Sequence, residues 1–284
     1  MPLTYAAAAS VPVAAYARWI EPVNLQVRHH TCSLPGLTTN RPLRLIHLSD
    51  LHASPAVPNS LIESAVGLAV DLQPDLICVT GDFVTHRGGW DSAWYRRTLR
   101  RLSAAAPTFA TMGNHDGGWR PSGMDDSARV RNLVRDSGLE VLHNRHAELN
   151  VGGGARLELV GLADVWSREF RPDLAFPKAA PLETTPRIVL SHNPDTKDRL
   201  ADRAWDLMLS GHTHGGQIVV PFMGAPWAPV ADMRYLHGMK PWGARQIHVT
   251  SGVGNALGVR LNCPPEIAVI ELTGGGDRGA GRVS

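Results

Sequence analysis

Two histidines stand one residue apart between glycines in the stretch SGHTHGGQ, residues 210–217, directly after a short apolar run. Four other short apolar runs end in polar residues of the kinds that bind metal ions. These endings are Asp50-Leu51-His52, Gly81-Asp82, Gly113-Asn114-His115-Asp116 and Ser191-His192. Imidazole, carboxylate and amide groups are common protein ligands of divalent metal ions. The pattern therefore indicates metal chemistry, on the condition that one fold brings the five endings together.

The type and number of these residues indicate which kind of metal site to expect. The expected ligands are Asp50, His52, Asp82, Asn114, His192, His212 and His214. All of them offer oxygen or nitrogen and none offers a thiolate, which favours manganese, iron, zinc or magnesium. Manganese is our first choice among these. The set is too large for one tetrahedral zinc ion. It suits two divalent ions that share one carboxylate, and Asp82, near the middle of the set, is the expected bridge.

The five apolar runs have the length of β-strands and lack clean alternation, as strands do when both faces of their sheet are covered. They are LRLIHLS (43–49), DLICVTG (75–81), PTFATMG (107–113), RIVLSH (187–192) and DLMLSG (206–211). Helical spacing lies between them at 59–72 and 94–102, and 147–164 predicts a hairpin. The carboxyl ends of parallel strands meet at one edge of an α/β sheet, where ligands bind. We therefore expect a layered α/β fold with the polar endings at one edge.

Taken in order, the motifs Asp-x-His, Gly-Asp, Gly-Asn-His-Asp, a single later His and Gly-His-x-His resemble the signature of the calcineurin-like metallophosphoesterases, over roughly residues 43–272. The resemblance implies a four-layer α/β/β/α sandwich with a dinuclear metal centre. It places one metal at Asp50, His52, Asp82 and His214, and the other at Asp82, Asn114, His192 and His212. It makes His115 the catalytic acid, steered by Asp116.

The resemblance also implies an activity: hydrolysis of a phosphodiester or pyrophosphate bond by direct attack of a metal-bridging hydroxide. The block GHTHGGQI, with YARWIEP near the start and SGVGNALGVRLNCPPEIAVIEL near the end, is similar to a bacterial branch of membrane- or envelope-associated phosphodiesterases. Some members of that branch hydrolyse UDP-2,3-diacylglucosamine in lipid A synthesis. A lipid-linked or nucleotide-linked phosphoester is therefore among the expected substrates.

Two other functions stay open from the sequence. An inactive scaffold with the same fold would have no use for a proton donor at His115, and a dinuclear peptidase or amidase would not account for the pair Asn114 and His115. Other residues are discounted as ligands. His47 and His248 lie inside strand-like runs and are expected to be structural, while Arg260 and Asn255 are open candidates for a phosphate contact.

The composition is that of an ordinary globular chain, with 284 residues, 43% hydrophobic and 19% charged. A net charge of +2 is too weak to indicate nucleic acid, and we expect no specific nucleic-acid binding. The three cysteines, Cys32, Cys78 and Cys263, are spaced too widely for a zinc ribbon, and their odd number gives no disulfide framework.

The chain divides by its sequence into an N-terminal apolar segment and linker (1–42), a metallophosphoesterase domain (43–273) and a disordered tail (274–284). The apolar stretch at 5–17 is shorter than the ~20 residues that span a bilayer. Its first cation, Arg18, follows the apolar run, whereas a signal peptide carries its positive charge before it. The segment suits an interfacial helix anchored by Trp19, the stub of a longer anchor, or a helix packed on the domain. We expect peripheral membrane contact, at the inner membrane or envelope, rather than a freely cytoplasmic protein.

Overall fold

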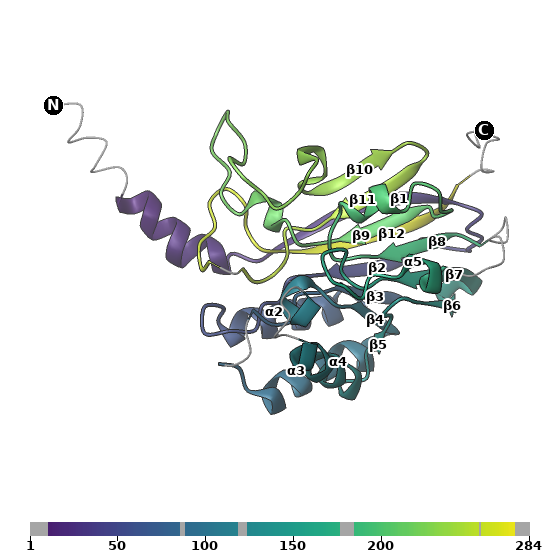
Figure 1. Cartoon of the computed structure of the whole chain (residues 1–284), viewed down its shortest axis with the longest axis horizontal. Coiled ribbons are helices and arrows are strands. Elements are labelled where there is room, and N and C mark those ends of the chain that lie inside the picture. The colour runs from purple at the N-terminus through teal and green to yellow at the C-terminus, as the bar shows by residue number, and fades with distance from the viewer. Residues whose placement is uncertain (1–10, 86–88, 119–123, 177–184, 256, 276–284) are drawn as a thin grey trace.

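The computed structural model describes residues 11–85, 89–118, 124–176, 185–255 and 257–275 of the chain (Figure 1). Two six-stranded sheets lie face to face and share an apolar core. Helices cover the outer face of the first sheet, and short helices and loops cover the outer face of the second. The chain thus forms the four-layer α/β/β/α sandwich that the resemblance implies.

The first sheet has the strand order β1-β12-β2-β3-β4-β5. Its strands are β1 (Gln26–Pro35), β2 (Leu43–Leu48), β3 (Leu76–Thr80), β4 (Thr108–Thr111), β5 (Glu140–Val141) and β12 (Glu266–Gly275). β2 to β5 are parallel, and β12 lies antiparallel to β2. Every residue of β3 is buried. A strand with both faces covered has no solvent side, which explains the continuous apolar run in its sequence.

Three helices cover the first sheet: α2 (Asn59–Asp71), α3 (Ser92–Ala105) and α4 (Met124–Asp136). The buried residues of α2 recur at helical spacing and are Leu61, Ile62, Ala65, Val66 and Ala69. α3 begins after Asp91, whose side chain accepts hydrogen bonds from the backbone N–H groups of Ala93 and Trp94. α2 and α3 thus lie where the sequence shows helical spacing.

The second sheet has the strand order β10-β11-β9-β8-β7-β6. Its strands are β6 (Arg145–Val151), β7 (Ala155–Gly161), β8 (Arg187–Leu190), β9 (Leu207–Ser210), β10 (Gly238–Trp242) and β11 (Arg245–Val249). The four central strands are parallel, and the edge strands β6 and β10 are antiparallel to their neighbours. β6 and β7 form the expected hairpin, with η4 (Gly152–Gly154) as its turn. The short helices α5 (Pro172–Ala175) and α6 (Thr196–Arg199) and the turn η6 (Met233–Tyr235) complete the outer layer.

The core between the sheets contains two histidines among its apolar side chains. The Nδ1 atoms of His47 and His248 lie 2.9 Å apart, and His47 Nε2 lies 2.8 Å from Thr80 Oγ1. Burial lowers the pKa of His47 to about 3, so the ring is neutral. These two histidines are structural, as expected.

β1 lies within residues 1–42, where the sequence suggests an apolar segment and a linker. The strand pairs with β12 over its whole length, and Cys32 and Leu34 reach the core between the sheets. Several of its other side chains are exposed at this edge of the sheet and polar. The strand therefore lacks the apolar run that marks the central strands.

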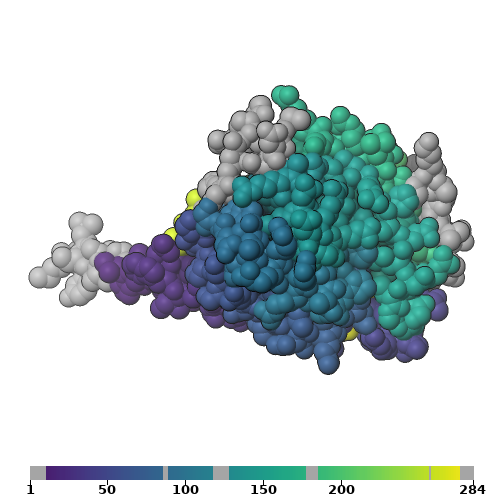
Figure 2. All heavy atoms as spheres, turned by 90° about the horizontal axis from the view of Figure 1, so that it is seen from below, coloured from purple at the N-terminus to yellow at the C-terminus, as the bar shows by residue number. Residues whose placement is uncertain are grey.

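The N-terminal end of the described chain leaves the sandwich. Residues 11–20 are helical, contain no buried residue, and project from the end of the molecule (Figures 1 and 2). In the ranges that the structure describes, no helix combines the length and the apolar character needed to cross a membrane. The expected tail, 274–284, starts inside β12, and its residues 276–284 lie outside the described residues.

Removal of residues 1–20 should leave the fold intact, because no residue of the helix at 11–20 is buried. Removal of residues 1–35 should destabilise the protein by several kcal/mol. It deletes β1 and its buried side chains, each of which contributes about 1.5–3 kcal/mol when it is a fully buried aliphatic group. Thermal unfolding followed by circular dichroism measures both effects. Equal losses of Tm in the two truncations would show that the helix belongs to the folded core.

Candidate metal centre

The five polar endings gather where strands of both sheets end. Asp50 and His52 follow β2, Asp82 follows β3, Asn114 follows β4, and the remaining histidines follow β8 and β9. The backbone is unusual at these positions. Five of the seven expected ligands have a left-handed φ, namely Asp50 (53°), His52 (48°), Asp82 (51°), His212 (70°) and His214 (49°). This conformation is uncommon for residues with a side chain, and such strain concentrates at functional sites.

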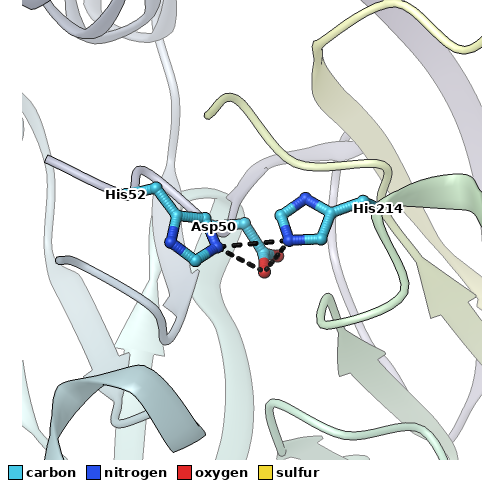
Figure 3. Close-up of side chains that lie close together, drawn as sticks. All are labelled: Asp50, His52 and His214. Carbon is cyan, nitrogen blue, oxygen red and sulfur yellow. Dashed lines mark hydrogen bonds and ion pairs between the residues drawn. The ribbon is translucent and has the colours of Figure 1, made fainter. Parts of the chain in front are cut away.

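Asp50, His52 and His214 form the first of two groups (Figure 3). The two rings face each other across the Asp50 carboxylate, with their Nε2 atoms 3.2 Å apart. Asp50 Oδ1 lies 3.8 Å from Nε2 of His52 and 3.6 Å from Nε2 of His214. Three donor atoms therefore surround one small volume, two of them from the loop after β2 and one from the loop after β9.

The geometry of this group fits a divalent metal ion. Two nitrogens bound at the usual distance to one ion, in tetrahedral or octahedral arrangement, lie about 3.0–3.4 Å apart. His52 Nδ1 lies 3.0 Å from the hydroxyl of Thr85, an arrangement in which Nδ1 donates and the lone pair of Nε2 points into the group. Burial lowers the pKa of His52 to about 3 and holds the pKa of His214 well below its ordinary value, so both rings are neutral. Two neutral imidazoles whose Nε2 atoms face each other across a carboxylate are placed to share a cation.

Asp50, Asp82 and His192 form the second group. Asp82 Oδ2 lies 3.2 Å from His192 Nε2 and 3.5 Å from His52 Nε2, so one carboxylate oxygen adjoins both groups. Asn114 Oδ1 lies 3.1 Å from His192 Nε2, and His212 Nδ1 lies 3.2 Å from the same atom. His192 Nδ1 donates to the carbonyl of Thr80 at 2.7 Å, which directs Nε2 towards this cluster. The structure thus brings all seven expected ligands into one connected cluster.

The electrostatics of the cluster also favour a cation. Asp50 and Asp82 are both buried, and burial, reinforced by the charge of Asp82, raises the pKa of Asp50 to about 6. For His192 the opposite holds: burial alone would lower its pKa, but the carboxylates of Asp82 and Asp50 raise it well above the ordinary value. Buried carboxylates require a compensating positive charge. A proton on His192 supplies part of it here, and a bound metal ion would supply it fully.

His115 and Asp116 lie in the π-helical turn η3 (Asn114–Gly118) after β4. His115 is half-buried beside the cluster, with its ring centroid 5.0 Å from that of His52 and its Nδ1 3.1 Å from the carbonyl of Thr85. Its backbone N–H donates to Asp82 Oδ1 at 2.9 Å. The buried carboxylate of Asp116 accepts hydrogen bonds from the backbone of Gly113 and Val84. Asp116 therefore braces the loop that carries His115.

The packing around the carboxylates leaves no room for larger residues at two glycines. A Cβ on Gly113 would lie 2.2 Å from Asp82 Oδ1, and a Cβ on Gly211 would lie 2.2 Å from Asp50 Oδ2. Close approach of one backbone to another side chain is the physical reason for glycine at these positions.

Several supporting residues do not stand out in the sequence. Thr80 and Thr85 act partly through backbone carbonyls, which no residue type reveals. Arg260 is fully buried and donates to the carbonyls of Ser251, Gly252, Gly254 and Cys263, so its guanidinium holds a loop and is not directed at a substrate phosphate. That loop packs on the first group, because a Cβ on Gly252 would lie 2.6 Å from Asp50 Cβ.

Asp164 is a further buried carboxylate beside the cluster. Burial raises its pKa to about 6, and the charge of His192 opposes that shift. Like the expected ligands, it follows the end of a strand, in this case β7. The rule that identified the other residues could therefore have found it.

Residues 43–216 match the sequence model of a family described as calcineurin-like phosphoesterase. The chain is 42% identical over 231 residues to the phosphodiesterase YaeI of Escherichia coli K12, which covers 81% of this chain and 82% of that protein. It is 28% identical over 324 aligned positions to the UDP-2,3-diacylglucosamine pyrophosphatase LpxG of Chlamydia trachomatis, covering 94% and 95%. It is also 29% identical over 264 positions to the metallophosphoesterase YkuE of Bacillus subtilis, covering 90% and 88%.

Substitution of Asp82 should affect metal binding more broadly than substitution of His52. Asp82 Oδ2 adjoins both groups, so Asp82→Ala should lower occupancy at two sites, whereas His52→Ala should mainly empty one. Elemental analysis of the manganese-loaded proteins gives the metal content per chain. Full occupancy by two ions in Asp82→Ala would exclude a bridging position for this carboxylate.

Proposed function

Because the chain belongs to the calcineurin-like phosphoesterase family, we propose that it is a metal-dependent hydrolase that cleaves a phosphodiester or pyrophosphate bond at a centre of two divalent ions. The observation that carries the proposal is the position of Asp82, whose Oδ2 adjoins a nitrogen ligand of each group. A carboxylate that bridges two ions needs this placement. Manganese is our first choice of metal, with iron, zinc or magnesium as alternatives.

The ligands would divide between the two ions. Asp50, His52, Asp82 and His214 would hold one ion, and Asp82, Asn114, His192 and His212 would hold the other. When bound, the ions would supply Lewis-acid chemistry, which lowers the pKa of water and offsets negative charge on the phosphoryl oxygens. Thr85 and Thr80 fix the orientation of His52 and His192 through their Nδ1 atoms, so that each ring keeps Nε2 for the metal.

We assign to His115 the transfer of a proton to the leaving oxygen. Its ring lies at the rim of the cluster, half-buried and beside His52, where it is close to the ligands without being among the expected seven. Asp116 keeps the ring in place by bracing the loop backbone at Gly113 and Val84. A positioned acid matters most when the leaving group is a poor one.

The names of two relatives suggest the class of substrate. A relative named as a phosphodiesterase favours a phosphodiester, and a relative named as a UDP-2,3-diacylglucosamine pyrophosphatase favours a lipid-linked or nucleotide-linked pyrophosphate. We also propose that the protein is membrane-associated. The helix at 11–20 exposes Val11, Trp19 and Ile20, and an exposed apolar helix with a tryptophan at its end suits the bilayer interface.

A substrate panel tests this function. The manganese-loaded protein should hydrolyse bis-p-nitrophenyl phosphate, and Asp82→Ala should abolish this activity because it removes the shared ligand. Comparison with a phosphomonoester, a cyclic nucleotide and UDP-2,3-diacylglucosamine separates the substrate classes by their kcat/KM. A protein that binds two ions and hydrolyses none of these compounds would be a scaffold with the family fold rather than a phosphoesterase.

His115→Ala tests the assignment of the acid. p-Nitrophenolate leaves readily without a proton, whereas an alkoxide does not. The variant should therefore retain its metals and lose little activity on the activated diester. On an alkyl ester it should lose about 10²–10⁴-fold in kcat, the usual contribution of a general acid. Equal losses on both substrates, with the metal content unchanged, would assign His115 to binding or charge stabilisation instead.

A further inference from the structure

Large apolar side chains stand exposed on three segments at the end of the molecule from which the N-terminal helix projects. They are Trp19 and Ile20 of the helix, Phe222, Met223 and Trp227 of the loop between β9 and β10, and Leu257 of the loop before β12. We call this set the apolar tip surface. Figure 1 shows the base of the helix beside these two loops, and Figure 2 shows the helix standing clear of the body.

Hydrogen bonds join the three segments into one unit. The backbone N–H of Arg260 donates to the carbonyl of Ala17 in the helix at 2.9 Å. The neighbouring Leu261 pairs with the β9–β10 loop, donating to the carbonyl of Gln217 and accepting from Val219 N–H. The three segments that carry the apolar residues are therefore held together by backbone hydrogen bonds.

Phe222 is displayed at the tip of a tight turn. Val220 and Gly224 pair across this turn, and Phe222 between them has a left-handed φ of 66° and a fully exposed side chain. A bulky residue rarely adopts this backbone conformation, and an aromatic ring in water lacks the stabilisation that burial of its apolar surface would give. Both features are unfavourable in an isolated protein, which indicates a partner that buries the ring.

The charge pattern identifies the kind of partner. No charged residue occurs in the sequence at 1–17, 216–231 or 252–259, which includes the part of the chain before the described helix. Exposed cations lie next to two of these segments: Arg18 beside Gly258, and Arg234, which is paired with Asp232. Hydrocarbon excludes charges, aromatic rings favour the membrane interface, and arginine favours anionic headgroups. The side chains also project from tips rather than line a groove, which suits a fluid surface.

The apolar tip surface is linked to the metal centre by short connections. The β9–β10 loop contains the expected ligands His212 and His214, and Phe222 follows His214 by eight residues. A hydrogen bond joins the start of this loop to its end: Thr213 Oγ1 donates to the carbonyl of Leu236 at 2.6 Å. Cys263 Sγ donates to the carbonyl of His214 at 3.1 Å. A partner bound at the tips would therefore contact a loop that also carries two of the expected metal ligands.

We propose that the apolar tip surface docks on a lipid bilayer, with Phe222 and Trp227 inserted among the headgroups, and that the metal centre thereby takes a phosphoester carried by a membrane lipid. The docking goes beyond contact by the N-terminal helix, because the folded domain itself supplies the inserted residues. The choice of a lipid-borne phosphoester deepens the proposed function and rests on it.

Vesicle binding by the full chain tests the proposal. Sedimentation with vesicles of phosphatidylethanolamine and phosphatidylglycerol should show binding by the unmodified protein. The double variant F222S/M223S, and separately W227S, should bind at least about tenfold more weakly, because burying one large apolar side chain contributes the free energy of such a factor. The matched control is L174S. Leu174 is similarly exposed but lies in α5, which packs against β6 at the other edge of the second sheet.

The outcomes separate the docking surface from the catalytic proposal. Unchanged binding by F222S/M223S, an equal loss in L174S, or no binding by the unmodified protein would overturn the docking surface. Light scattering that shows a dimer dissociated by F222S/M223S, without vesicle binding, would assign the surface to a second copy of the chain. All variants should retain the Tm and the turnover of bis-p-nitrophenyl phosphate. Phe222-dependent binding without any turnover would leave the docking surface standing and reject the phosphoesterase.

Discussion

The burial of two carboxylates side by side is the constraint on which the rest of this structure depends. Asp50 and Asp82 are almost without solvent, and the groups around them are mainly neutral imidazoles. Removing two negative charges from water is unfavourable unless positive charge replaces the lost hydration. The protein offers the proton of His192 and a few backbone N–H groups, such as those of His212 and His115. The set of donors is therefore suited to a cation, and the fold is organised to keep the donors together.

That organisation uses both sheets. The first sheet contributes the loops after β2, β3 and β4, and the second contributes the loops after β8 and β9. Because the two sheets pack face to face, the ends of their parallel strands form one rim, and the expected ligands, far apart in sequence, meet there. Hydrogen bonds between the two sheets, such as the one from His192 Nδ1 to the carbonyl of Thr80, fix the orientation of individual side chains at this rim.

The strands β2, β3, β4, β8 and β9, the helices α2 and α3 and the cluster of the seven expected ligands could be predicted from the sequence, because each depends on local pattern and on the rule that parallel strands end together. The edge strand β1 could not, because its polar side chains hide its pairing with β12. The contact of the Thr85 carbonyl with His115 could not be predicted either, because every residue has a backbone carbonyl and the sequence does not show which one is used. Arg260 shows a third limit: its residue type suggested phosphate, whereas burial and four carbonyl acceptors give it a structural role.

The left-handed backbone at five of the expected ligand positions bears on how a metal ion would enter the centre. Donor atoms that an ion must gather from flexible loops lose conformational entropy on binding. In this protein the ordering happens during folding, since the backbone, the glycines at 113 and 211 and the threonine contacts already aim the side chains. The loss of chain entropy therefore occurs when the protein folds. Metal binding would then depend mainly on the release of protons and bound water. Exchange of one ion for another would proceed without refolding of the loops.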